Sequence, residues 1–310
     1  MIQARTCQAQ NSRAGHRRTI AIAALLFAVC LAGTAQAQSP EPPAAPEKSE
    51  KATGNARGRA YLFRGLIGVI DWGMDELAGR IKRSGVTATI DSHLMWHSIV
   101  TQAIADYRRD PQPITVIGHS IGGDSAVAFA ENLDAAHIPV SLLITYDPTR
   151  MADHVPPNVE RYINLYQSSN ILGGGDLTQS HGFHGHYASY NLKDRPEIIH
   201  INLDKFDRIQ EQLAGKIKSL AVVSGRGGGE SVPIRLVPPA TGPIELWDSG
   251  MPVTAHAGDT LQSIATTYHV PVWSLEQLNR GSATALAEGA RIVVPRFLGS
   301  AVPKSPPPAH

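Results

Sequence analysis

Short apolar runs alternate with helical patterns along residues 58–222, and this alternation restricts the fold more than any other feature. The apolar runs cover residues 60–63, 86–90, 114–117, 140–146, 162–166 and 197–201. Apolar residues at helical spacing occur at 72–82, 97–108, 121–133 and 206–220. Strands that alternate with helices of this length form βαβ units with parallel neighbours. The segment is therefore predicted to be an α/β domain whose mostly parallel sheet carries helices on both faces.

The N-terminal segment has the three parts of a secretory signal peptide. Three arginines between positions 13 and 18 precede an apolar run over residues 20–32, and Ala35 and Ala37 supply the small residues of a cleavage site. The apolar run is shorter than the roughly 20 residues that a membrane-spanning helix needs. Residues 1–37 are therefore predicted to be removed on export, which leaves no transmembrane anchor. The mature protein is expected to be periplasmic or secreted.

Removal of residues 1–37 changes the composition. Cys7 and Cys30 both lie in the removed part, so the mature chain has no thiol for a disulfide, a nucleophile or a metal site. The removed part carries four arginines and no acid, so 24 basic and 27 acidic residues remain and the formal net charge falls from +1 to −3. This near-neutral balance argues against a nucleic-acid partner. Lipidation at Cys30 and twin-arginine export through Arg17 and Arg18 are the alternatives to ordinary cleavage.

Two stretches have the composition of linkers. Residues 38–57 are rich in Pro, Ala, Glu, Lys and Ser and are predicted to be a disordered spacer. Residues 223–250 are rich in Gly and Pro and are predicted to be a second linker. A compact module is expected at 251–297, followed by a disordered, Pro-rich tail at 298–310.

Ser120 is the strongest candidate for a catalytic residue. It lies in Gly118-His119-Ser120-Ile121-Gly122, after a buried strand pattern and before a helical one. The five-residue match is weak in a chain with 28 glycines, and the alternative is a Gly-rich turn with an incidental serine. The strand before it and the helix after it are typical of a nucleophile elbow. At that position the helix dipole points at a developing oxyanion.

A serine nucleophile needs a base, and the base needs an acid that orients it. Asp147 is the candidate acid, because it ends the apolar run 140–146; the alternative is an Asp-Pro turn. Adjacent parallel strands lie about 4.8 Å apart, which brings Asp147 within reach of a histidine beside Ser120. His200 is the candidate base, because it lies at the end of the last predicted strand, at the same edge. Such a triad needs no metal or organic cofactor, so none is predicted.

A second group of histidines competes for the role of base. His181, His184 and His186 lie in a Gly-rich segment that also contains Asp176. Closely spaced imidazoles with a carboxylate are also plausible metal ligands, although surface histidines without a ligand are more common.

The oxyanion hole is predicted to use two backbone N–H groups. One comes from Ile121, the residue after the nucleophile, and the other from the Gly-bearing loop after the first strand, where Leu66 is the candidate.

On these motifs the segment 58–221 resembles the α/β-hydrolase superfamily. Its segments Thr145-Tyr146-Asp147-Pro148, Asn164-Leu165-Tyr166-Gln167 and His200-Ile201-Asn202 are similar to a group of compact bacterial lipase-like and thioesterase-like hydrolases. The resemblance implies Asp147 as acid, His200 as base and an acyl ester or thioester as substrate. No clear strand precedes Ala60 and no long lid is inserted, which favours smaller or soluble esters over insoluble fat.

Residues 251–297 resemble a LysM module. The resemblance rests on residues 253–261, Ile264-Ala265, Tyr268, Val270, Leu275, Leu278-Asn279 and 289–295. It implies a βααβ fold that binds N-acetylglucosamine-containing glycans, in bacteria chiefly peptidoglycan. It also implies a glycan groove at Gly258, Asp259 and Thr260 and at the loop after Asn279. Asp259 is expected to cap the first helix; a small domain without a ligand is the alternative.

The two resemblances together predict an exported serine hydrolase that a LysM module holds at the cell wall. The alternative is a peptidoglycan-binding protein whose hydrolase-like domain is inactive. Peptidoglycan O-acetyl groups, lipid acyl esters and thioesters all fit a Ser-His-Asp site, so the sequence leaves the substrate open.

Overall fold

The computed structural model describes residues 57–66, 72–152, 154–170, 173–222, 229–281 and 285–297. The predicted signal peptide, the tail and all but the last residue of the predicted spacer lie outside this part. Within it, no helix is long and apolar enough to cross a membrane.

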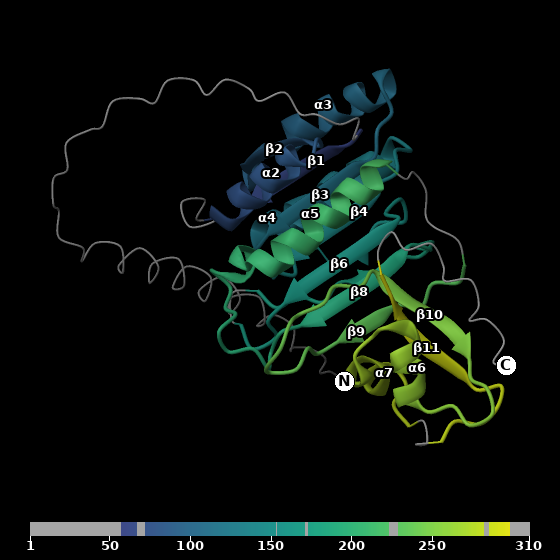
Figure 1. Ribbon diagram of the computed structural model, residues 1–310. Helices are drawn as coiled ribbons and strands as arrows, with labels where there is room; N and C mark the ends of the chain where they lie inside the picture. The colour runs from purple at the N-terminus through teal and green to yellow at the C-terminus, as the bar shows by residue number, and fades with distance from the viewer. Residues whose placement is uncertain are drawn as a thin grey trace, which may run out of the picture. The chain divides into compact units, whose positions relative to one another are not determined.

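A seven-stranded sheet forms the centre of the fold, in the order β2-β1-β3-β4-β6-β8-β9 (Figure 1). Its strands are β1 (Arg59–Arg64), β2 (Thr87–Ser92), β3 (Ile114–His119), β4 (Leu142–Tyr146), β6 (Arg161–Tyr166), β8 (His186–Asn191) and β9 (Ile234–Leu236). Every pairing between them is parallel. β3 and β4 are buried along their whole length, which explains their uninterrupted apolar runs. A separate small sheet pairs β5 (His154–Val155) with β7 (Thr178–Gln179).

Helices cover both faces of the large sheet. α2 (Trp72–Arg83) and α5 (Asp207–Val222) share one core cluster with it, and α5 crosses its near face in Figure 1. α3 (Trp96–Arg109) and α4 (Ile121–Ala135) share the other. Along β3, Val116 belongs to one cluster and Ile117 to the other, because successive strand side chains point to opposite faces. The predicted α/β fold is confirmed.

The strand predicted at residues 197–201 is wrong. These residues form turns before a short 3-10 helix, η2 (Leu203–Lys205), and the last long strand of the large sheet is β8. In the apolar run only Ile198 is buried, whereas Ile199 is 48% exposed. So short a run does not distinguish a strand from a turn. β8 was missed because the small residues Ala188 and Ser189 separate its buried tyrosines, Tyr187 and Tyr190, so that it has no large apolar run.

Part of the segment predicted as a linker is folded. β9 extends the sheet as an edge strand, and Val232 pairs with Gly250. Trp247 is fully buried in the same core cluster as α2 and α5. Most Gly and Pro residues of the described part, 229–250, therefore lie in irregular segments between packed residues, and Gly250 itself belongs to a strand.

The C-terminal module has the predicted βααβ order. It consists of β10 (Ser249–Thr254), α6 (Leu261–Tyr268), α7 (Val272–Leu278) and β11 (Arg291–Arg296), and β10 pairs antiparallel with β11. Thr260, not Asp259, caps α6, because its side chain accepts from Ser263 N in a capping box. Gln277 of α7 exchanges hydrogen bonds of 2.9 Å and 2.7 Å with the backbone of Val237, beyond β9.

Candidate active site

Ser120 lies on a tight turn between β3 and α4. Its backbone has φ 56° and ψ −130°, a conformation that costs a non-glycine residue free energy. Two hydrogen bonds of 2.8 Å hold the turn, from Ser120 N to Tyr146 O and from Gly123 N to Ser120 O. The serine therefore stands at the carboxyl edge of the sheet and at the N-terminus of α4.

Two glycines of the motif are required by close packing around this turn. A Cβ at Gly118 would lie 2.0 Å from the carbonyl oxygen of Gly122, and a Cβ at Gly122 would lie 2.3 Å from that of Phe63. Both obstacles are backbone atoms of regular elements, which cannot move aside cheaply. The spacing of the glycines is thus explained by the geometry that presents Ser120.

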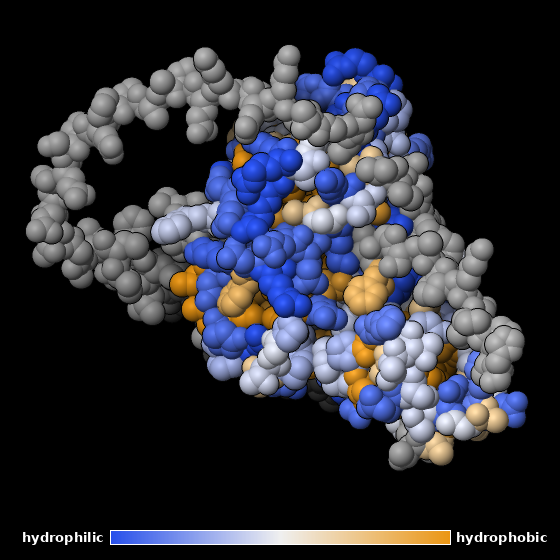
Figure 2. Space-filling model, in the orientation of Figure 1, coloured by the Kyte–Doolittle hydropathy of each residue, from blue (hydrophilic) through white to orange (hydrophobic). Residues whose placement is uncertain are grey.

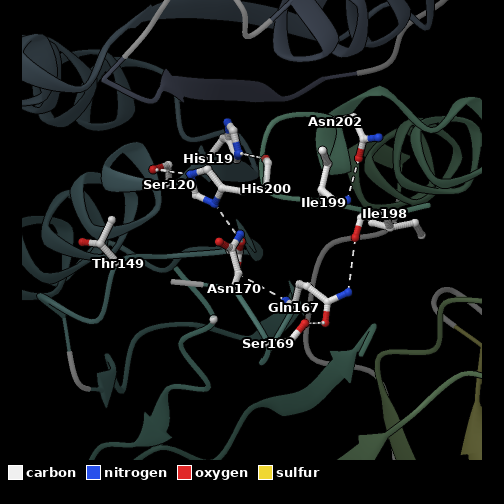
Figure 3. Close-up of polar contacts among 12 residues, drawn as sticks. His119, Ser120, Thr149, Gln167, Ser169, Asn170, Ile198, Ile199, His200 and Asn202 are labelled. Carbon is white, nitrogen blue, oxygen red and sulfur yellow. Dashed lines mark hydrogen bonds and ion pairs between the residues drawn. The ribbon is translucent and has the colours of Figure 1, made fainter. Parts of the chain in front are cut away.

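His200 and Asp147 form a hydrogen-bonded chain with Ser120, and Figure 3 shows the contact between the labelled Ser120 and His200. His200 Nε2 lies 2.9 Å from Ser120 Oγ, and His200 Nδ1 lies 2.7 Å from Asp147 Oδ2. With Nδ1–H donating to the carboxylate, Nε2 is the nitrogen that can accept the serine proton. The structure brings together the three residues that the sequence singled out as nucleophile, acid and base.

The Asp147 carboxylate is fully buried and accepts two further hydrogen bonds. Gln167 N donates to Oδ1 at 3.2 Å, and Asn170 Nδ2 donates to Oδ2 at 2.6 Å. A buried carboxylate needs such donors, because burial removes its hydration. Sequence reasoning gave neither residue a role in the site. Gln167 follows a predicted strand at the catalytic edge, and that position could have identified it.

The turn that carries His200 is tied to the neighbouring segments. His119 Nε2 lies 2.8 Å from His200 O, so the histidine beside Ser120 contacts the turn that carries His200. Gln167 Nε2 donates to the carbonyl oxygens of Leu192 and Ile198 at 2.9 Å and 3.2 Å. These bonds replace the strand pairing that was expected to place His200.

The two predicted oxyanion donors border the start of α4. Ile121 is the first residue of α4, where backbone N–H groups lack an acceptor within the helix. Gly122 packs against the carbonyl oxygens of Phe63 and Arg64, so the chain leaving β1 passes beside this helix terminus. Leu66 lies two residues further along, and residues 67–71 of the same loop lie outside the described part.

The histidines of residues 181–186 differ in their surroundings. His181 and His184 are exposed, whereas His186 is buried with Nδ1 2.9 Å from Asp248 Oδ2. His186 begins β8, so it lies at the amino edge of the sheet, opposite Ser120. Across the described ranges, no group of three or more His, Cys, Asp or Glu residues could hold a metal ion. Asp176 accepts hydrogen bonds from Tyr187, Ser189 and Arg235.

His186 belongs to a buried ionic cluster away from the site. Arg161 Nε lies 3.6 Å from Asp248 Oδ2. Burial lowers the pKa of Lys216 to about 8, although Asp248 acts in the opposite direction. The cluster joins the start of β6 and β8 to α5 and to the residue before β10.

The residues predicted to line the glycan groove of the LysM module shape its loops. Gly258 adopts φ +85° with nothing within 4 Å of where a Cβ would be. Asp259 Oδ2 accepts from His256 N at 2.7 Å, and Thr260 caps α6. Asn279 Nδ2 donates to Leu275 O and Val293 O, while Oδ1 accepts from Val293 N. Their role in binding a glycan stays a prediction.

Comparisons with known proteins bear on both parts of the chain. The LysM domain family matches residues 254–295, which confirms the predicted module. No curated protein matches the chain. A protein of the alpha/beta hydrolase superfamily from Xanthomonas campestris pv. campestris is 17% identical, covering 38% of this chain and 76% of its own, with a TM-score of 0.29. The esterase domain of a Rhodothermus marinus protein is 13% identical, covering 39% of this chain and 68% of its own, with a TM-score of 0.28. Neither likeness identifies a reaction for this chain, since unrelated functions share folds.

Proposed function

We propose that this chain is an exported serine hydrolase that cleaves an acyl ester or thioester and is held at the cell wall by its LysM module. The observation that carries the proposal is the hydrogen-bonded chain from Asp147 through His200 to Ser120. The strained turn and the helix N-terminus at Ser120 support it further, because nucleophile elbows combine these features.

The geometry supports acyl transfer through a covalent intermediate. Ser120 Oγ attacks the carbonyl carbon while His200 Nε2 takes its proton. Asp147 keeps the His200 ring in place and stabilises its positive charge. The N–H groups of Ile121 and Leu66 bind the oxyanion. His200 then gives the proton to the leaving group, and a water molecule releases the acyl group from Ser120 by the same steps.

The LysM module supports a location on peptidoglycan or another N-acetylglucosamine-containing glycan. Gly258, Asp259, Thr260 and the loop after Asn279 are the proposed contact regions. Removal of residues 1–37 on export would place the enzyme in the same compartment as this glycan. A pull-down of the purified full-length chain with insoluble peptidoglycan tests this part separately from catalysis.

A fluorophosphonate probe tests the catalytic part. It labels an activated serine, so we expect the wild type to be labelled and Ser120→Ala not to be. Ser219→Ala is the matched control, since Ser219 is an exposed residue of α5 away from the triad. A folded wild type that resists the probe but pellets with peptidoglycan would favour the alternative, a glycan-binding protein with an inactive hydrolase-like domain.

A further inference from the structure

Exposed apolar side chains gather at the catalytic edge of the sheet. Eight large apolar residues in the described ranges are exposed, and seven of these lie in segments that follow β1, β2 or β4 or that flank His200. The seven are Leu66, Trp72, Leu94, Met95, Met151, Ile199 and Ile201. Figure 2 shows apolar surface on the side toward which the arrows of β6 and β8 point in Figure 1. Apolar surface of this kind marks a place that binds apolar groups.

Four of these residues line two cavities that flank Ser120. The first, which we name the Ile121 cavity, has a volume of about 530 Å³. It is lined by Ile121, the residue after Ser120 in the chain. Its apolar lining consists of Leu94, Trp96, Ile121, Ala128, Met151 and Ala152. Ala128 is seven residues after Ile121 on α4, so this apolar lining extends roughly 10 Å along the helix.

The polar groups of the Ile121 cavity are partly committed elsewhere. Asp124 accepts hydrogen bonds from the backbone of Thr149, Met151 and Ala152. Ser125 Oγ donates to a backbone carbonyl, that of His93 or of Ile121. Glu131 lies about three helical turns beyond Ile121, and His93, His97 and His154 complete the polar lining. The part of the cavity nearest Ser120 is therefore suited to an apolar chain.

The second cavity, which we name the His200 cavity, has a different chemistry. Its volume is about 500 Å³, and the catalytic histidine itself lines it together with Gln167, Ser169, Asn170, Lys193, Pro196, Ile199 and Ile201. Ser169 Oγ donates to Gln167 Oε1 and can accept, while the Lys193 ammonium offers three donors. The lining thus combines hydrogen-bonding groups with apolar walls.

Proton transfer decides which part of a substrate enters which cavity. His200 Nε2 must deliver its proton to the oxygen of the leaving group, so the leaving group lies on the side of His200. The carbonyl oxygen points to the N–H of Ile121. The acyl substituent then takes the remaining side of the tetrahedral carbon, which is the side away from His200.

We infer that the Ile121 cavity binds the acyl group and the His200 cavity binds the alcohol, in an ester whose acyl group is longer than acetyl and whose alcohol carries hydroxyl groups. This inference rests on the proposed function. A buried methylene contributes about 0.8 kcal/mol, so kcat/KM rises roughly fourfold per methylene until the Ile121 cavity is filled.

An acyl series tests the first half of the inference. The wild type, Ala128→Leu and Ala135→Leu are assayed on p-nitrophenyl esters from acetate to octanoate. Ala128→Leu occupies part of the Ile121 cavity, so the octanoate-to-butanoate ratio of kcat/KM falls roughly 15-fold, the value of about two methylenes. Ala135→Leu is the same change at an exposed position of α4 outside both cavities, and it keeps the wild-type ratio. An acetate optimum, or an equal ratio in all three proteins, overturns the inference.

An alcohol series tests the second half. The wild type prefers glyceryl monohexanoate to ethyl hexanoate, and Lys193→Trp, which obstructs the His200 cavity, lowers this preference several-fold. Lys218→Trp, at an exposed position of α5, keeps it. If Lys193→Trp changes the acyl optimum and Ala128→Leu changes the alcohol preference, the assignment is wrong. Ser120-dependent hydrolysis with neither response refutes this inference alone, whereas no Ser120-dependent hydrolysis of any ester refutes the proposed function as well.

Discussion

The substitution Asp147→Asn tests how the acid supports His200, because three donors surround the carboxylate. His200 Nδ1 and Asn170 Nδ2 lie 2.7 Å and 2.6 Å from Oδ2, and Gln167 N lies 3.2 Å from Oδ1. An asparagine has only one acceptor oxygen. If the asparagine NH₂ group replaces Oδ2, it faces two other donors, His200 Nδ1 and Asn170 Nδ2. If the NH₂ group replaces Oδ1, it faces one other donor, Gln167 N.

The orientation with a single donor–donor contact is the less costly one, and it has a defined consequence. The amide oxygen still accepts from His200 Nδ1, so the ring keeps the tautomer that serves Ser120. A hydrogen bond to a charged group contributes about 1.5–3 kcal/mol against about 1 kcal/mol for a neutral one. Losing the charge therefore lowers kcat by between a fewfold and about 30-fold. The buried contact with Gln167 N costs about 1–3 kcal/mol of folding free energy.

Kinetics and denaturation of two variants check this reasoning. Asp147→Ala removes every acceptor and leaves His200 unoriented, so its kcat falls by about 10³ or more. Asp147→Asn should retain at least ten times the kcat of Asp147→Ala while unfolding at lower denaturant concentration than the wild type. An Asp147→Asn variant as inactive as Asp147→Ala, or as stable as the wild type, would refute the account of the three donors.

Three further predictions concern packing, pH and the LysM module. Gly122→Ala destabilises the protein by several kcal/mol, because its Cβ would meet Phe63 O at 2.3 Å. Gly215→Ala, in open space on α5, stabilises the protein by up to about 1 kcal/mol. Urea denaturation measures the free energy of unfolding of both variants, and equal effects would contradict the packing argument. Lys216 has a pKa of about 8 in the folded protein, against 10.5 for the unfolded chain. Between pH 8 and 10.5 the unfolded state therefore binds more protons than the folded state. The free energy of unfolding rises with pH over this range, by about 3 kcal/mol. Lys216→Met removes this rise, as the difference between its stability curve and that of the wild type from pH 7 to 11 should show. Asn279→Ala loses two hydrogen bonds with Val293 of β11 and one with Leu275 of α7, which lowers the free energy of unfolding by about 2–3 kcal/mol and weakens pelleting with peptidoglycan. Undiminished pelleting would separate Asn279 from the groove.

The sequence was most informative where a strand ends. β1 to β4 and β6 were predicted because apolar residues recur throughout each of them. Ser120 and Asp147 follow from these strands, since carboxyl ends of parallel strands share one edge. The position of His200 was predicted for the wrong structural reason. It lies on a turn, and its apolar neighbours Ile199 and Ile201 line a cavity instead of a core.

Other features depend on contacts between distant segments, which local patterns do not contain. Asn170 reaches Asp147 only through the turn after β6, which a hydrogen bond from Asn170 N to Gln167 O closes. β9 has only three residues, and Trp247 lies among turn-forming residues, so both were assigned to a linker. A short run and a lone tryptophan have no period, and their burial is decided by the elements they pack against.

Mass spectrometry of an acid-quenched reaction tests the central claim most directly. The full-length protein is mixed with a p-nitrophenyl ester and quenched within the first turnover, and its peptides are then mapped. The account predicts that the mass of one acyl group is added to Ser120, and that Ser120→Ala carries no such adduct. Release of p-nitrophenol by the wild type with no acyl group on Ser120, or with the acyl group on another residue, would contradict it.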